Sequence, residues 1–80
     1  MQQAELMERV SKVLCNELGI EEKQIQIESH LMNDLGADSL QSLEVIMSLE
    51  EEFDIIIPDE ALDKIEKVSD IQKIVGDIIA

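Results

Sequence analysis

The sequence DLGADSL, residues 34–40, contains the signals that set where the central helix of this chain begins. Gly36 allows the chain to turn tightly, and Asp38 is a residue type that accepts a hydrogen bond from the first turn of a helix. Gln41 follows three residues after Asp38, which completes the pattern of a capping box. The stretch therefore predicts that a helix starts immediately after Asp38 and runs over residues 39–53.

This expected helix has two different apolar faces. At 100° per residue, one arc faces the core, with Leu43 at its edge. The members of that arc are Val45, Ile46, Leu49 and Phe53. A second stripe alternates apolar and acidic side chains, and its members are Leu40, Glu44, Met47 and Glu51. A face that meets only solvent has no need of the two apolar residues in this stripe.

Helical spacing and stop signals predict three more helices around this one. The first carries Leu6, Met7, Val10, Val13, Leu14 and Leu18 and ends at Gly19. Pro58, at a first helical position, opens a brief third helix through Ile65. A capping box of Ser69 and Gln72 opens a fourth, whose stripe is Ile71, Ile74, Val75, Ile78 and Ile79. Close packing is expected at Gly76.

Residues 20–37 show no sustained period and form a long first loop, which single apolar side chains are expected to pin to the core. The expected pins are Ile25, Ile27, Leu31, Met32 and Leu35. A short strand over residues 25–28 is an alternative, although no second strand-like segment could pair with it. The expected fold is all-α: a small four-helix bundle with three longer helices and one short third helix, in one domain over residues 1–80.

The net charge and the apolar fraction of the chain exclude some classes of function. Nineteen Asp or Glu against six Lys or Arg give a net charge of -13, which excludes nucleic acid as an obvious partner. Residues 24–63 hold eleven acids and no Lys or Arg. Because 45% of the residues are apolar, the chain should still bury a core.

No apolar run could span a bilayer and no secretory signal is present, so we expect a cytoplasmic monomer, or one in an organelle matrix after removal of an import peptide.

Ser39 is the residue best placed to carry chemistry. The start of a helix favours an attached phosphate, because free backbone N–H groups and the positive end of the helix dipole face it. The alternative is that Asp38 and Ser39 are simply two possible caps. A hydrolytic role for Ser39 is disfavoured, because the only histidine, His30, is expected to be an exposed loop residue and no Gly-x-Ser-x-Gly turn surrounds the serine. Cys15 is expected to be a small filler.

Three motifs together resemble the acyl carrier protein of type II (dissociated) fatty acid synthesis. They are DLGADSL at residues 34–40, EEEF at residues 50–53 and IPDE at residues 57–60, and the likeness extends over essentially the whole chain. The resemblance implies that a phosphopantetheinyl transferase (holo-ACP synthase) esterifies Ser39 with 4′-phosphopantetheine from coenzyme A. It implies that Asp38 helps that transferase to organise its metal and coenzyme A.

The same resemblance implies how the chain acts. It would carry growing fatty acyl chains as thioesters on the arm, without catalysing a reaction, and present them to synthesis enzymes with basic docking patches. The implied partner-binding residues are Leu40, Glu44, Met47, Glu50, Glu51 and Asp59. No specific metal site is expected, because the acids over residues 50–60 lack the pattern of a calcium loop.

Some residues depart from the family pattern, and two other functions stay open. Leu31 and Leu62 could reshape an acyl pocket, and the Ile55-Ile56 pair could cover the core or contact a partner. A carrier of a polyketide or other specialised pathway would share Ser39 and the bundle. An acidic helical interaction module, anchoring a basic partner helix through Leu40 and Met47, belongs to a different class.

Overall fold

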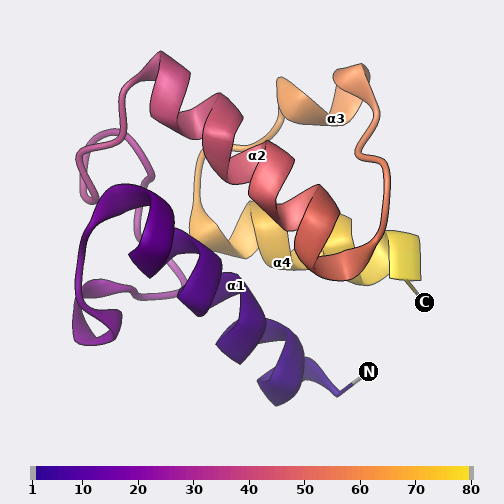
Figure 1. Ribbon diagram of the computed structural model, residues 1–80, viewed down its shortest axis with the longest axis horizontal. Coiled ribbons are helices and arrows are strands. Elements are labelled where there is room, and N and C mark those ends of the chain that lie inside the picture. Colours follow the sequence, from indigo (N-terminus) through magenta and orange to yellow (C-terminus); the bar gives the residue numbers. More distant parts are fainter. Residues whose placement is uncertain (1, 80) are drawn as a thin grey trace.

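Helices account for the regular structure of this chain, which a computed structural model describes over residues 2–79 (Figure 1). In chain order the elements are α1 (Gln3–Leu18), the 3-10 helix η1 (Glu22–Gln24), α2 (Ser39–Phe53), α3 (Asp59–Leu62) and α4 (Val68–Ile79). Within residues 2–79 no strand is present, so the all-α prediction is confirmed and the alternative strand over residues 25–28 is wrong. Only an isolated antiparallel bridge joins His30 to Lys67.

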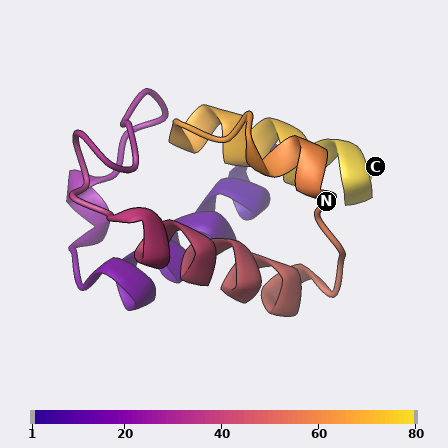
Figure 2. The same ribbon diagram turned by 90° about the horizontal axis from the view of Figure 1, so that it is seen from above.

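Helix α1 packs against both α2 and α4 and so connects the two sides of the bundle. Figure 2 shows α2 on one side of the molecule, with α3 and α4 on the other. Aliphatic side chains fill the space between them, and the predicted core arc of α2 is buried in full: Val45, Ile46, Leu49 and Phe53. Helices α1, α2 and α4 each contribute buried side chains to this core, and Ala61 and Leu62 of α3 pack against it. The described residues extend over 29 × 26 × 20 Å.

Two glycines shape α1 and its contact with α4. Gly19 ends α1 as predicted, in the left-handed conformation with φ 65°, and its N–H donates to the Cys15 carbonyl at 2.9 Å. A side chain added at Gly76 would place its Cβ 3.4 Å from Leu6 Cδ2. This spacing agrees with the close packing predicted at Gly76, and it shows that the neighbouring helix is α1.

Arg9 of α1 joins the first helix to the carboxyl end of α2. Its Nε lies 2.8 Å from Glu52 Oε2, and its Nη2 donates to the Glu52 carbonyl. Its guanidinium carbon also lies 4.5 Å from the centre of the Phe53 ring. A cation at this end of α2 faces the negative pole of the helix dipole, so all of these contacts favour the same α1–α2 packing.

The long loop between α1 and α2 is fastened to the segment that precedes α4. Leu31 donates its N–H to the Glu66 carbonyl at 2.9 Å, and Val68 donates to the Ser29 carbonyl at 3.0 Å. Leu31 is buried, and Ile25 and Leu35 pack against the core, as predicted. The predicted pins Ile27 and Met32 are wrong, because these side chains are 43% and 49% exposed. Backbone hydrogen bonds do the anchoring that those two side chains were expected to do.

The ends of the last two helices differ from the prediction. Pro58 is the N-cap of α3 rather than its first helical residue, and α3 ends at Leu62 rather than Ile65. Helix α4 starts at Val68, so the predicted Ser69–Gln72 capping box is wrong.

Asp70 performs the capping of α4 instead. Its Oδ2 accepts from the N–H groups of Lys67 and Glu66 at 2.9 and 3.0 Å. The Ser69 N–H is already used, since it donates to the Ile27 carbonyl at 2.9 Å. A carboxylate in the first turn therefore replaces the serine hydroxyl as the start signal.

Replacing Arg9 by Ala should lower the free energy of unfolding by about 1–2 kcal/mol, because the variant loses a charged hydrogen bond and a cation–aromatic contact. Urea unfolding followed by circular dichroism measures the change. Lys12→Ala is the matched control, since it removes the same charge from α1 but only an exposed pair with Glu8 at 3.9 Å. Equal losses in the two variants would show that Arg9 acts only by reducing the net negative charge.

Asp70 should make stability depend on pH in acid. The hydrogen bond from the Lys67 N–H lowers the pKa of the Asp70 carboxyl; partial burial opposes this, and the Glu66 N–H and the ammonium groups of Lys67 and Lys73 support it. A lowered pKa in the folded state stabilises the protein above the unfolded value of about 3.9, and this contribution is lost as pH falls through the folded value.

We therefore expect Asp70→Ala to be less stable than Asp77→Ala by about 1 kcal/mol near pH 7, because Ala cannot accept the N–H bonds of Glu66 and Lys67. Asp77 is an exposed residue of the same helix, so its variant removes the same charge. The gap between the variants should shrink as pH falls below about 3.9. Urea unfolding from about pH 7 to about pH 3 measures it, and a gap that does not change with pH would contradict the capping role.

Candidate functional site

The start of α2 is fixed by the predicted capping box. Asp38 Oδ1 accepts from the Gln41 N–H at 2.7 Å, and Gln41 Oε1 accepts from the Asp38 N–H at 3.2 Å. Gly36 precedes the cap with φ 77°, a conformation that side chains rarely adopt. Ser39 is consequently the first residue of α2, where backbone N–H groups have no partner inside the helix.

Ser39 differs from the other serines in its exposure. The chain has six serines and no threonine or tyrosine, and all six lie within the described residues. Ser11 and Ser29 are buried, and Ser42, Ser48 and Ser69 are half-buried. Ser48 also donates its hydroxyl to Glu17 of α1. Ser39 alone of the six is exposed, so its hydroxyl is the one most accessible to an enzyme.

A cleft of about 810 Å³ opens beside Ser39. It lies between α2, the loop that precedes α2, and the segment from α3 to residue 66. Its apolar lining consists of Leu31, Met32, Leu43, Ile46, Leu62 and Ile65, and its polar lining of His30, Ser39, Ser42, Asp59, Asp63 and Glu66. A group attached to Ser39 would therefore have an aliphatic cleft within reach, of a size typical of ligand sites.

His30 holds the rim of this cleft and is half-buried rather than an exposed loop residue as predicted. Its Nδ1 accepts from the N–H groups of Met32 and Asn33, at 3.2 Å each. Its own N–H donates to Asp34 Oδ2 at 2.7 Å. These bonds occupy Nδ1 in shaping the loop, which gives His30 a structural role near Ser39.

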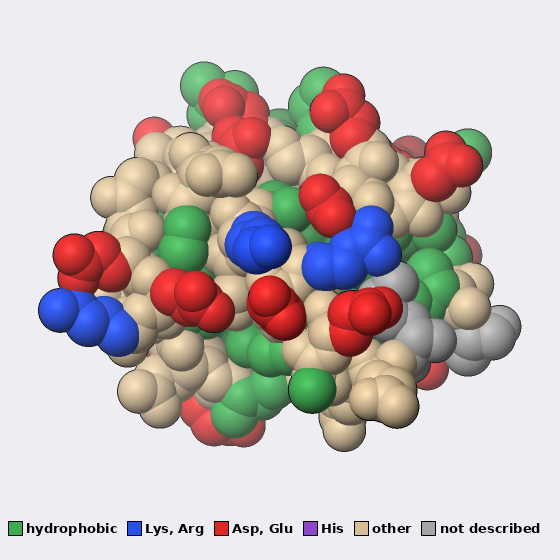
Figure 3. All heavy atoms as spheres, turned by 60° about the horizontal axis from the view of Figure 1, so that its bottom comes forward, with side chains coloured by type: hydrophobic (Ala, Val, Ile, Leu, Met, Phe, Trp, Pro, Cys, Tyr) green, Lys and Arg blue, Asp and Glu red, His purple; other side chains and the backbone are tan. Residues whose placement is uncertain are grey.

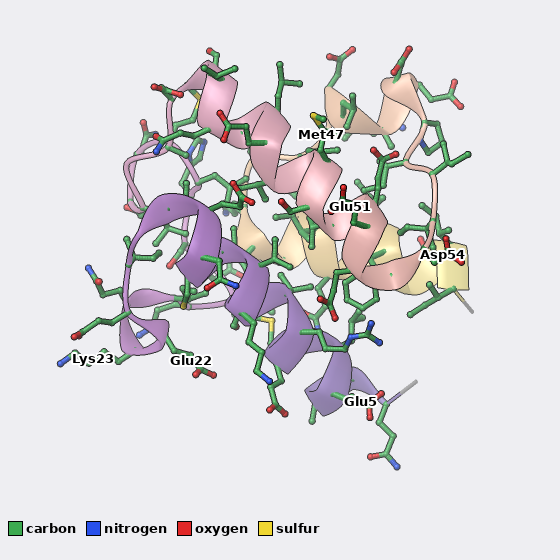
Figure 4. All side chains as sticks on the ribbon, in the orientation of Figure 1. Glu5, Glu22, Lys23, Met47, Glu51 and Asp54 are labelled. Carbon is green, nitrogen blue, oxygen red and sulfur yellow. The ribbon has the colours of Figure 1, made fainter. Side chains whose placement is uncertain are left out.

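The alternating stripe of α2 lies on the surface. Leu40 and Met47 are 65% and 63% exposed, and Glu44 and Glu51 are exposed as well. Glu44, Met47 and Glu51 line one shallow hollow with Glu17 and Ser48, which places them side by side. Figure 4 shows Met47 and Glu51 along α2, with Asp54 beyond its carboxyl end. The four residues Leu40, Glu44, Met47 and Glu51 are called the α2 stripe below.

Glu50 and Asp59, the two other predicted partner-binding residues, differ from each other in setting. Asp59 is exposed at the start of α3 and lines the cleft beside Ser39. Glu50 is half-buried, and its Oε2 accepts from the Ile57 N–H at 2.8 Å. The Glu50 carboxylate is therefore engaged in holding the connection between α2 and α3.

The charges are distributed unevenly over the surface. Figure 3 shows a face on which Lys and Arg side chains lie among Asp and Glu side chains. All six basic residues lie outside residues 24–63, in or near α1, η1, α3 and α4. Arg9, Lys12, Lys23 and Lys67 each form an ion pair with a nearby glutamate. The start of α2 and the α2 stripe are therefore strongly negative.

A reactive cysteine and a metal centre are two other kinds of site, and the described residues favour neither. Burial, and then the charge of Glu22, raise the pKa of the Cys15 thiol, which lowers its reactivity at neutral pH. Within residues 2–79 no group of three or more His, Cys, Asp or Glu residues could hold a metal ion. No helix of the described chain is both long and apolar enough to cross a bilayer.

Several lining residues of the cleft carry no sequence signal that distinguishes them as site residues. Ser42, Ile46 and Ile65 fall within the expected helices, and His30 falls within the expected loop. Leu43 carried a signal, because it stood at the edge of the core arc; it is 52% exposed at the cleft. The two departures Leu31 and Leu62 both line the cleft, as expected of residues that could reshape it.

Comparison with known protein families shows which family has this arrangement of helices, cleft and serine. A family model described as "Phosphopantetheine attachment site" matches residues 8–75, which include the loop, the whole of α2, α3 and most of α1 and α4. The cleft and the exposed serine at the start of α2 lie inside the matched region. The chain therefore belongs to the phosphopantetheine attachment family, whose members are carriers of covalently bound 4′-phosphopantetheine and not enzymes.

Proposed function

We propose that this protein is an acyl carrier protein of type II fatty acid synthesis, with 4′-phosphopantetheine attached to Ser39. The observation that carries the proposal is the position of Ser39, the only exposed serine of the six, at the amino end of α2 and beside an aliphatic cleft. The attachment requires a hydroxyl that a transferase can reach. It also places a phosphate where helix N–H groups and the helix dipole favour negative charge.

Asp38 supports this site in two ways. It holds the first turn of α2 in place through the Gln41 N–H, which fixes Ser39 as the first residue of the helix. Its carboxylate is exposed next to Ser39, where the resemblance to acyl carrier proteins implies that the transferase binds its metal and coenzyme A. In this proposal Asp38 is a binding and positioning residue, and the transferase supplies the catalysis.

The cleft gives the cargo an aliphatic environment. The arm supplies a terminal thiol that carries an acyl group as a thioester. Leu31, Leu43 and Ile46 offer aliphatic contacts near the attachment point, and burial of each methylene group from water is worth about 0.8 kcal/mol.

The α2 stripe would present the carrier to its enzymes. Leu40 and Met47 are exposed apolar residues that alternate with Glu44 and Glu51 along α2, and no Lys or Arg lies within residues 24–63. Such a surface suits partners with basic patches around small apolar sites, and it favours fast, transient and salt-sensitive docking. A carrier must exchange partners at each step, so weak docking is an advantage.

The first test is the mass of the intact protein after incubation with coenzyme A, Mg²⁺ and a broad-specificity phosphopantetheinyl transferase. We expect a gain of one phosphopantetheinyl group in the natural protein and none in Ser39→Ala. Ser42→Ala, a change one helical turn further along the same cleft, is the control that should still gain the group. A gain that survives Ser39→Ala, or no gain at all, would contradict the proposal.

The second test concerns docking. Glu44→Lys and Glu51→Lys should each raise the KM of a fatty acid ketoacyl synthase roughly tenfold at low salt, with little change in kcat, because a reversed charge weakens encounter rather than chemistry. Glu22→Lys makes the same charge change on η1, far from α2 in Figure 4, and should leave KM close to that of the natural protein.

Unchanged kinetics in both α2 variants would show that the α2 stripe is not the docking surface. An equal effect of Glu22→Lys would show that only the net charge matters. Urea unfolding of each variant verifies that the bundle is intact.

A further inference from the structure

Ile56 is the most exposed large apolar residue of the described chain. Its side chain is 83% exposed, against 65% for Leu40 and 63% for Met47. It lies in the connection between α2 and α3, next to Ile55, which packs against the core, and Ile57, which is buried. The neighbours therefore anchor the segment from both sides while Ile56 points to solvent.

The backbone around Ile56 is held in one shape by Glu50. The Glu50 carbonyl accepts from the Ile55 N–H at 3.1 Å, and its Oε2 accepts from the Ile57 N–H at 2.8 Å. Asp54 ends α2 with φ 54°, the left-handed conformation that turns the chain sharply. Ile56 is thus displayed on a fixed turn, and ordering that turn costs little when a partner binds.

The surroundings of Ile56 are acidic. Asp54, Asp59 and Glu60 are exposed near it in sequence, and no Lys or Arg lies within residues 24–63. The segment follows the carboxyl end of α2, at the opposite end of that helix from Ser39 (Figure 1). A helix of 15 residues is about 22 Å long at 1.5 Å per residue, which sets the approximate separation of the two ends.

We propose that Ile56 is an apolar anchor that inserts into a socket on the partner enzymes, with the socket edged by Lys or Arg side chains. The acidic surroundings select a basic partner, and they disfavour a second copy of this chain, whose net charge is also -13. Ile56 would select among partners at about 20 Å from the point where the arm enters them. This inference rests on the proposed carrier function.

Glu50 has a defined role in the display of Ile56. It is a positioning residue, because its carboxylate fixes the turn that displays Ile56 instead of meeting the partner directly. Gln can accept the same hydrogen bond without the charge, whereas Ala cannot. The two replacements therefore separate the role in positioning from the role of the charge.

The experiment measures the Kd between the pantetheinylated protein and the ketoacyl synthase of the same organism by titration calorimetry. Ile56→Ala should weaken binding about tenfold, as expected for loss of most of a buried isoleucine. Ile27→Ala is the matched control, since Ile27 is 43% exposed in the loop before α2, and it should bind within about twofold of the natural protein. Glu50→Ala should weaken binding, and Glu50→Gln should restore most of the loss.

Two results would overturn the inference. In one, Ile56→Ala gains the phosphopantetheinyl group and binds the synthase as tightly as the natural protein; the carrier function then stands while the anchor does not. In the other, sedimentation shows a dimer that Ile56→Ala dissolves, so that Ile56 is covered by a second copy. Absence of any mass gain in the natural protein would instead contradict the carrier function itself.

Discussion

The pair of hydrogen bonds between Asp38 and Gln41 is the interaction on which the rest of the structure depends. It sets the residue at which α2 begins, and the helical period then assigns every later residue to a face. Because α2 starts at Ser39, this serine stays outside while the core arc turns inward. The cap fixes the residue at which the helix starts, and the buried apolar arc fixes which face turns inward, so together they determine the position of Ser39.

A second constraint is the conflict between the charge of -13 and the need to fold. Repulsion among the acidic side chains does not unfold the bundle. Burial of the aliphatic side chains of the three long helices contributes more free energy than this repulsion costs in water. The basic residues are used mainly on the other elements, where Arg9 joins α1 to the end of α2. This leaves the surface around Ser39 negatively charged. Because that charge is not neutralised within the isolated protein, the surface is suited to basic partners.

Much of this could be predicted from the sequence, because α2 carries strong local signals: its cap, its bounds and its core arc are all confirmed. The errors arose where tertiary hydrogen bonds override local signals. Ser69 looked like a cap, but its N–H is used by the Ile27 carbonyl and Asp70 caps α4 instead. The partial burial of His30 and the shape of the cleft depend on how the loop packs against the segment before α4. The hydrophobic periodicity of the sequence does not predict this tertiary contact.

Attachment of the arm at the capped start of α2 is what links this fold to the proposed function. Fragmentation of the modified protein into peptides, with mass spectrometry of each fragment, tests it most directly, because it locates the added group on one residue. Every modified fragment is expected to carry the phosphopantetheinyl group on Ser39, the exposed serine. Finding the group on Ser42 or Ser48 of the same helix would contradict it.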